Sequence, residues 1–176
     1  MAGNYSYQGE LDRHYRDIRR EYPKIPEMEV VPDYGKSWGH LEFYPAGEHN
    51  RAGKLVNPLD KPSIRVSDKT LVGPKLKSAI FGDMLHDRNI PGLNKLRGDI
   101  KKSLTKEQRQ RSKSRYNRGK RLWNEKRTYD KFFEYSDLDA FIRGYLSPDW
   151  RNEWSNAYTD EQKSIMDQFI QSLRGN

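Results

Sequence analysis

The sequence predicts an α+β fold, in which a small N-terminal antiparallel sheet packs on a central helix and a mainly helical C-terminal half follows. Three observations carry this prediction. Strand-like runs bounded by Pro, Gly and Asn are confined to residues 28–67. A helical apolar pattern begins near residue 71, and two Thr-x-x-Gln capping boxes open helices further on. We expect one domain over residues 10–176, behind a flexible or docking arm at residues 1–9.

The first predicted helix spans residues 10–22. Leu11, Tyr15 and Ile18 recur at the spacing that places side chains on one face of a helix. Pro23 follows, and proline cannot continue a helix because it lacks the backbone N–H and clashes with the preceding turn. The segment is therefore expected to be a short, charged helix with a narrow apolar face.

Three strands are predicted after this helix, at residues 28–31, 40–44 and 63–67. Between the second and third strands, residues 45–61 carry charges of both signs together with Gly and Pro. These residue types are typical of turns and surface connections. We therefore expect an exposed loop there and a small sheet built from the three strands.

The central helix, predicted at residues 74–87, is the best-formed helical signal in the chain. It opens at Gly73-Pro74, since proline's fixed φ suits the first helical position. Its apolar residues cover about half of the helix circumference. They are Leu76, Ile80, Phe81, Met84 and Leu85. We expect this arc to form the core against the sheet.

Further helices are predicted in the C-terminal half. Apolar residues spaced three and four apart mark short helices at residues 93–100 and 138–145. The box at Thr105 opens a helix that extends to about residue 127, and the box at Thr159 opens the final helix. Arg174-Gly175 ends that last helix.

Composition limits both the core and the class of protein. Hydrophobic residues make up 34% and charged residues 33% of the chain, against typical values of about 45–50% and about 25%. The core is therefore small for the length, although 12% aromatic residues argue against disorder. The absence of cysteine excludes disulfides and thiolate metal sites. No apolar run reaches the roughly 18 residues of a membrane-spanning helix.

One segment carries the excess positive charge. Residues 95–127 have a net charge of +11, whereas residues 1–94 have +1 and residues 128–176 have −4. Seven cations crowd one stretch of it beside Tyr116 and Trp123: Arg109, Arg111, Lys113, Arg115, Arg118, Lys120 and Arg121. So basic a stretch predicts an anionic partner. An acidic protein surface and a nucleic acid are both open, and we favour the protein.

A metal-dependent hydrolase is the enzymatic alternative. His86 and Asp83 lie three residues apart on the central helix, and His40 and Glu42 are further candidate ligands from the strand region. Catalytic zinc sites usually contain two or three histidines, and the HExxH pattern is absent. We therefore favour a structural His/Asp pair. With no Gly-rich phosphate loop, GxSxG motif or cysteine nucleophile, we expect no catalytic residues and no cofactor.

Aromatic residues gather in the acidic C-terminal part of the chain, at Tyr145, Trp150, Trp154 and Tyr158. In so polar a stretch they form either a small core of their own or anchors for a partner, since interfaces are enriched in Trp and Tyr. Both interpretations are open. The candidate interface residues are therefore five aromatics, namely Tyr116 and Trp123 of the basic segment with Trp150, Trp154 and Tyr158.

Several short motifs resemble those of a known group of phage proteins. They are HLEFYP at residues 40–45 with Glu48, KPSIRV at 61–66, GDMLH at 82–86 and the YTDEQ helix at 158–173. Over roughly residues 38–173 the chain resembles uncharacterised modules in tail- or ejection-associated virion proteins of tailed bacteriophages. The resemblance implies a virion location and a role in assembly, and it assigns no catalytic residue.

We therefore expect a non-enzymatic structural or assembly protein of a bacteriophage tail, head–tail connector or ejection apparatus. Its expected partners are other virion proteins in a multi-subunit assembly, bound through charged and aromatic surfaces. Before assembly it would reside in the host cytoplasm. A hydrolase centred on His86 and a nucleic-acid-binding protein using residues 106–127 are the alternatives.

Overall fold

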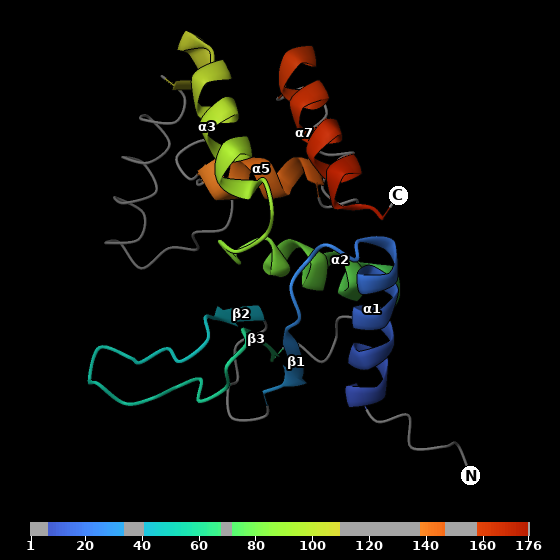
Figure 1. The fold of residues 1–176 in the computed structure, drawn as a ribbon, viewed down its shortest axis with the longest axis vertical. Coiled ribbons are helices and arrows are strands. Elements are labelled where there is room, and N and C mark those ends of the chain that lie inside the picture. The colour runs from blue at the N-terminus through green and yellow to red at the C-terminus, as the bar shows by residue number, and fades with distance from the viewer. Residues whose placement is uncertain (1–6, 34–40, 68–71, 110–137, 147–157, 176) are drawn as a thin grey trace, which may run out of the picture. The chain divides into compact units, whose positions relative to one another are not determined.

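The computed structural model describes residues 7–33, 41–67, 72–109, 138–146 and 158–175. The α+β class is confirmed, because this part of the chain contains helices and a single three-stranded sheet (Figure 1). The chain divides into two compact units, of which the first comprises Met1–Pro91 with Ser172–Asn176 and the second comprises Gly92–Gln171. The expectation of one domain over residues 10–176 stays a prediction.

The first unit begins with helix α1, Tyr7–Glu21. Residues 7–9 are therefore helical and do not belong to the predicted N-terminal arm, whose other residues lie outside the described ones. Leu11, His14 and Ile18 are buried along one side of α1. A hydroxyl also fixes the chain after this helix, because Tyr15 Oη accepts a hydrogen bond of 2.9 Å from the amide of Met28.

The second helix, α2, spans Gly73–Met84, and its predicted apolar arc is buried as expected. It ends three residues earlier than the sequence suggested. The amide of His86 donates to the carbonyl of Asp83, and that of Asp87 donates to the carbonyl of Met84, each at 3.1 Å. These three-residue bonds tighten the chain into a turn, which stops the helix before His86.

The sheet contains β1, Glu29–Pro32; β2, Leu41–Tyr44; and β3, Ser63–Val66, in the order β1-β3-β2. β2 pairs antiparallel with β3, but β1 pairs parallel with it, so the prediction of a purely antiparallel sheet is wrong. The three strands alternate in direction along the chain, and β3 rather than β2 lies in the middle. The first and third strands, which run in the same direction, therefore meet side by side.

The burial of β3 accounts for its central position. Ile64 and Val66 are fully buried, whereas every residue of β2 is only half-buried, as an edge strand allows. Helix α2 packs on β2 and β3, while α1 packs on β1 and on α2. The apolar face of the sheet is thus covered by the two helices of the first unit.

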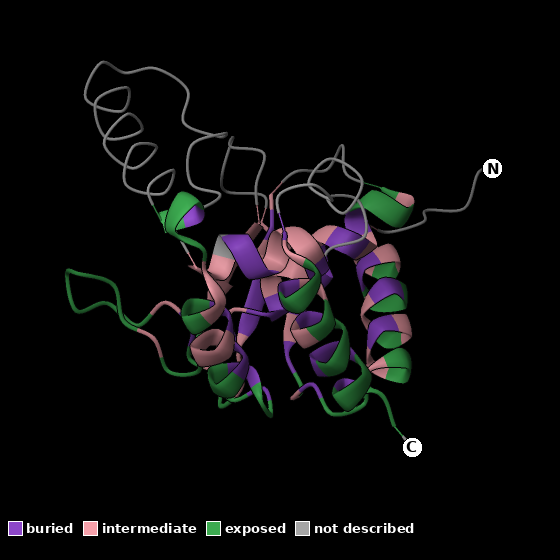
Figure 2. Ribbon diagram, turned by 90° about the horizontal axis from the view of Figure 1, so that it is seen from above, coloured by how far each residue is buried: buried purple, intermediate pink, exposed green. Residues whose placement is uncertain are grey.

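The second unit contains α3, Leu93–Ser103, and α5, Leu138–Leu146, with most of α7, Asp160–Leu173. The predicted apolar residues Leu93, Leu96 and Ile100 are all buried on α3. α3 packs on α5, and Arg97 forms an ion pair with Asp139 between these two helices. Figure 2 shows buried and exposed faces alternating around the helices, as amphipathic patterns require.

Both predicted capping boxes are present. The amide of Gln108 donates to Thr105 Oγ1 at 3.1 Å, and the amide of Thr105 donates to Gln108 Oε1 at 2.9 Å. The same two bonds join Thr159 and Gln162, at 3.2 Å and 3.0 Å. Each box satisfies two backbone donors that a helix N-terminus otherwise leaves without partners.

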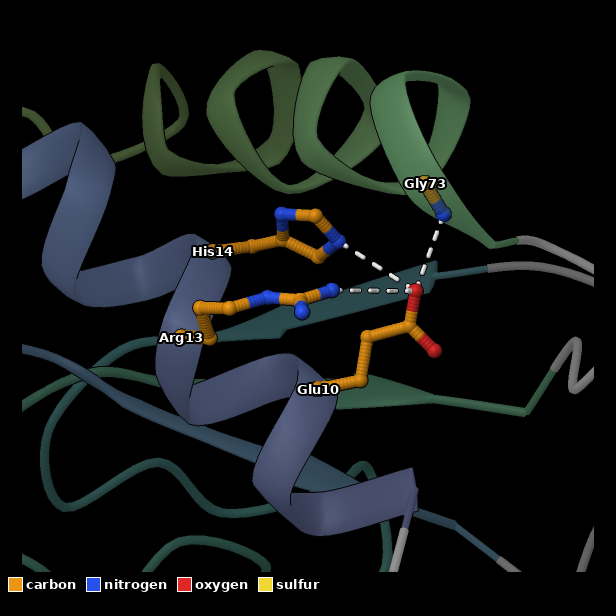
Figure 3. A network of polar contacts seen from close by, with 4 residues as sticks. All are labelled: Glu10, Arg13, His14 and Gly73. Atoms are coloured by element: carbon orange, nitrogen blue, oxygen red, sulfur yellow. Dashed lines mark hydrogen bonds and ion pairs between the residues drawn. The ribbon is translucent and has the colours of Figure 1, made fainter. Parts of the chain in front are cut away.

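Helix α2 is capped in a different way, by a side chain from another helix (Figure 3). Its N-cap residue, Val72, supplies no side-chain hydrogen bond. Instead Glu10 on α1 accepts a hydrogen bond of 2.9 Å from the amide of Gly73, and the same oxygen lies 3.3 Å from Nε2 of His14 and 3.9 Å from a guanidinium nitrogen of Arg13. A carboxylate at a helix N-terminus is stabilised by the helix dipole. Glu10 therefore links α1 to the start of α2.

We expect Glu10→Ala to lower the free energy of unfolding by about 1 kcal/mol, the usual cost of losing a helix cap. The hydrogen bond from Gly73, supported by His14 and Arg13 and opposed by burial, holds the pKa of Glu10 below its usual value of 4.5. A lowered pKa stabilises the fold above the unfolded value, and this stabilisation disappears as pH falls through the folded value. Urea denaturation at pH 7 and pH 3 measures the effect.

The matched control is Glu10→Gln, which keeps an acceptor for Gly73 and removes the charge. It should lose about 0.5 kcal/mol at pH 7, and its difference from the wild type should become smaller as the pH falls through the folded pKa of Glu10. A difference that is the same at both pH values would contradict the role of the charged carboxylate.

Candidate functional site

The β2–β3 loop, residues 45–62, is the most exposed ordered feature of the first unit, and Figure 1 shows it extending away from the strands. Asn57 closes its base and is 1% exposed. The Asn57 amide nitrogen donates to the carbonyls of Tyr44, Pro45 and Lys61 at 2.9–3.1 Å. An amide has only two hydrogens, so one of them is shared between two acceptors. One buried side chain thus holds together the two ends of the loop.

The outer part of the loop has its own backbone pairing. His49 and Leu55 form an antiparallel bridge, and the amide of Val56 donates to the carbonyl of Glu48 at 2.8 Å. At the tip, Asn50 Oδ1 accepts from the amides of Ala52 and Lys54, both at 3.0 Å. The loop is therefore a small braced hairpin.

An arginine fixes the loop to the sheet on the face opposite the helices. The guanidinium carbon of Arg65 lies 4.4 Å from the centroid of the Tyr44 ring, a cation–π contact. The same side chain donates a hydrogen bond to the carbonyl of Val56, and the hydroxyl of Tyr44 donates to Glu42. These contacts anchor the loop from its middle as well as from its base.

The braced loop presents a mixed surface. Residues 49–55 are all exposed, and they include two cations, Arg51 and Lys54, but no acidic residue. Leu55, beside Lys54, keeps 43% of its surface exposed. Exposed leucines are common singly, but here the apolar side chain lies at the end of a rigid projection next to positive charge. Such a surface suits binding to another macromolecule.

The metal-site residues are only partly brought together. At the end of α2, Asp83 Oδ1 lies 3.8 Å from His86 Nε2, and the ring of Phe43 on β2 lies 5.8 Å from the His86 ring. Because strand neighbours point to opposite faces, Glu42 lies on the far face of the sheet from His86. His40 lies outside the described residues. No group of three His, Asp or Glu able to hold a metal occurs within the described part of the chain, and the metal site that would include His40 stays a prediction.

We therefore expect no stoichiometric zinc in the purified protein, and an unchanged fold in His86→Gln. A zinc site needs three or four protein ligands, whereas the described geometry joins His86 to a carboxylate and an aromatic ring. Elemental analysis after purification without chelators measures the metal, and circular dichroism measures the fold. About one zinc per chain, absent from His86→Gln, would instead favour the hydrolase alternative.

Of the seven predicted basic-segment residues, the structure describes Arg109. Its guanidinium donates to the carbonyls of Leu104, at 3.2 Å, and Lys101, at 2.9 Å. Cations at a helix C-terminus bind the last carbonyls and interact favourably with the dipole. Arg109 therefore caps the end of α3. The other six residues lie outside the described ones, as do Tyr116 and Trp123.

Among the aromatics, Tyr158 is described and belongs to a core. It is 8% exposed, its ring centroid lies 4.6 Å from that of Phe141 and 5.3 Å from that of Tyr145, and its hydroxyl donates to the carbonyl of Phe141 at 2.8 Å. These contacts favour the small-core interpretation for this residue. Trp150 and Trp154 lie outside the described residues, so their interface role stays a prediction.

The sequence did not predict that the β2–β3 loop is held together by internal hydrogen bonds, although it correctly predicted that the loop is exposed. The available signals were Asn50 and Gly53, which suit a tight turn, and Asn57-Pro58, which suits a fixed bend. Gly53 adopts a φ of 77°, in the left-handed region that favours glycine.

Comparisons with protein-family models, with curated proteins and with solved structures gave no match for this chain. None of the described helices combines the length and the apolar character needed to cross a membrane.

Proposed function

We propose that this chain is a non-enzymatic structural and assembly protein of a bacteriophage particle, which binds neighbouring subunits through charged and aromatic surfaces. The observation that carries the binding role is the braced β2–β3 loop, with an exposed leucine beside two cations at its tip. A preformed loop loses little conformational entropy when it binds, so a small contact area can hold a partner.

The small size of the hydrophobic core supports a role in binding to neighbouring subunits. The buried apolar residues form a small core for a chain of this length, as expected from a hydrophobic content of 34%. A small core limits the stability of an isolated subunit, and contact with neighbours stabilises the folded form by mass action. The placement in a phage particle rests on the resemblance over residues 38–173.

Mass spectrometry of gradient-purified particles tests the proposal. The chain should be present at a fixed copy number in mature particles of the phage that encodes it. A phage-encoded protein that is not part of the particle serves as the control for contamination, and it should be depleted. Absence of the chain from particles would contradict the proposal.

The basic segment gives a prediction that separates the two classes of partner. We expect the wild-type chain to bind duplex DNA only weakly at physiological salt, because the sequence of the segment lacks glycine-spaced aromatics and matches no known base-reading motif. Neutralising Arg111, Arg115, Arg118 and Arg121 to Gln should instead abolish assembly with acidic protein neighbours. Fluorescence anisotropy between about 50 and 200 mM salt, conditions over which phosphate-bound complexes weaken most, measures DNA binding.

Arg→Lys at the same four positions is the matched control, since it keeps the charge and should keep assembly. Tight DNA binding by the wild type would reverse the conclusion if neutralisation also made its salt dependence shallower. The expected change in slope is a little under one unit for each phosphate that the protein no longer neutralises. The nucleic-acid alternative would then be favoured.

A further inference from the structure

The exposed face of α7 is acidic. Asp160, Glu161 and Asp167 are exposed on it, and Lys163, which is half-buried, is its one cation. A shallow hollow lies along this face and is lined, among the described residues, by polar side chains. These are Asp160, Lys163, Ser164, Asp167, Gln168 and Gln171.

Two of these acidic residues have no ion-pair partner in the described part of the chain. They are Asp160 and Glu161, in the first turn of the helix. The same holds for the two cations at the tip of the β2–β3 loop, Arg51 and Lys54, which lie within ion-pair distance of no described carboxylate. The described part of the chain therefore presents two unpaired positive charges on one projection and two unpaired negative charges in the first turn of α7, of which Asp160 also lines the hollow.

We propose that the β2–β3 loop of one copy docks on the acidic face of α7 of a second copy. This inference rests on the proposed function, for which it names the partner and the surfaces. Arg51 and Lys54 meet Asp160 and Glu161, and Leu55 loses its exposure to water in the contact. Complementary charges steer the encounter and fix its register, while the burial of Leu55 adds apolar stabilisation.

The contact joins two different surfaces, so it is heterologous. After two copies have bound, one of them keeps a free α7 face and the other keeps a free loop, so the pair can bind further copies at both ends. Contacts of this kind propagate into a ring when the rotation between copies closes and into a filament when it does not.

Sedimentation velocity of the full chain tests the docking. The wild type should sediment as an assembly at low salt and shift to the monomer in about 1 M salt, where the screening length is about 3 Å. Arg51→Glu with Lys54→Glu should yield a monomer, and so should Asp160→Lys with Glu161→Lys. An equimolar mixture of the two variants should assemble again, because the wild-type loop of one variant binds the wild-type α7 surface of the other, and the two charge-reversed surfaces that remain also carry opposite charges.

The mixture excludes misfolding as the cause, since a variant that fails to fold cannot restore assembly, and circular dichroism checks each variant alone. Lys24→Glu with Lys75→Glu removes two exposed cations elsewhere on the first unit and should leave assembly unchanged. A wild type that is monomeric at low salt, or a mixture that stays monomeric, overturns the docking. Either result leaves the proposed function standing if the chain is present in purified particles, so the two failures are distinguishable.

Discussion

Replacing Ile80 with aspartate is expected to unfold the first unit. Ile80 is fully buried in the middle of the apolar arc of α2, where that helix packs on β2 and β3. A carboxylate in this position would lose its hydration without gaining a partner, which costs on the order of 4 kcal/mol or more. That cost is comparable to the whole stability of a small domain, roughly 5–15 kcal/mol. Far-ultraviolet circular dichroism and urea denaturation measure the result.

Two variants on the same helix provide controls. Ile80→Val removes a single methyl group and should cost about 1 kcal/mol. Lys75→Asp places the same new charge at an exposed position in the first turn of α2, where the helix dipole favours an anion. It should leave the free energy of unfolding within about 0.5 kcal/mol of the wild type. An Ile80→Asp variant with an unchanged melting temperature would show that α2 is not central to the core.

Local signals predicted the helices well because each of those signals acts within a few residues. The buried arc of α2 and the apolar stripe of α3 follow from periodicity. The boxes at Thr105 and Thr159 place two helix starts correctly, because a capping box is satisfied within four residues of chain. The sequence placed the strands to within one or two residues for a similar reason, since Pro, Gly and Asn bound them.

Pairing between distant residues could not be read from the same signals. The apolar pattern of a strand says which face is buried, but it does not say which strand takes the centre of the sheet. Ile64 and Val66 gave a weak indication, because a wholly apolar inner face suits a central strand. The hydrogen bond by which Glu10 caps the start of α2 at Gly73 joins residues 63 positions apart in the chain. The sequence of neither segment predicts this contact by itself.

In the candidate site too, the sequence predicted contacts between near neighbours in the chain but not contacts between distant residues. Sequence indicated that residues 45–61 are exposed, yet the rigidity of this loop depends on Arg65 and on the three carbonyls that Asn57 reaches. Sequence also brought Asp83 and His86 together, since helical spacing decides that contact. It grouped Glu42 with them because it could not say which face of the strand meets α2.

The second large effect is expected at Gln162, where the two capping boxes meet. Gln108 Nε2 donates to Gln162 Oε1 at 2.9 Å, and Gln162 Nε2 donates to Gln108 Oε1 at 2.8 Å. Both amides are buried, at 8% and 0% exposed, and Gln162 also donates to the carbonyl of Ser103 at 3.2 Å. The first turns of two helices, 54 residues apart in the chain, are thus joined by a reciprocal amide pair.

We expect Gln162→Ala to lower the free energy of unfolding by about 3 kcal/mol. The change removes a helix cap, worth about 1 kcal/mol, and leaves the buried amide of Gln108 without its partner, which costs about 1–3 kcal/mol. Gln168→Ala, on the exposed side of the same helix, is the matched control and should stay within about 0.5 kcal/mol of the wild type. Urea denaturation measures both variants.

A double-mutant cycle separates the amide pair from the caps. If the pair is real, Gln108→Ala and Gln162→Ala should together cost less than the sum of the single changes, because each single change already leaves one buried amide without its partner. The coupling should fall in the range of about 0.5–3 kcal/mol seen for residues in contact. Two independent caps would give a coupling of zero, since each box closes within its own helix. Additive costs would therefore show that the helix starts are capped separately and that the amide pair contributes nothing.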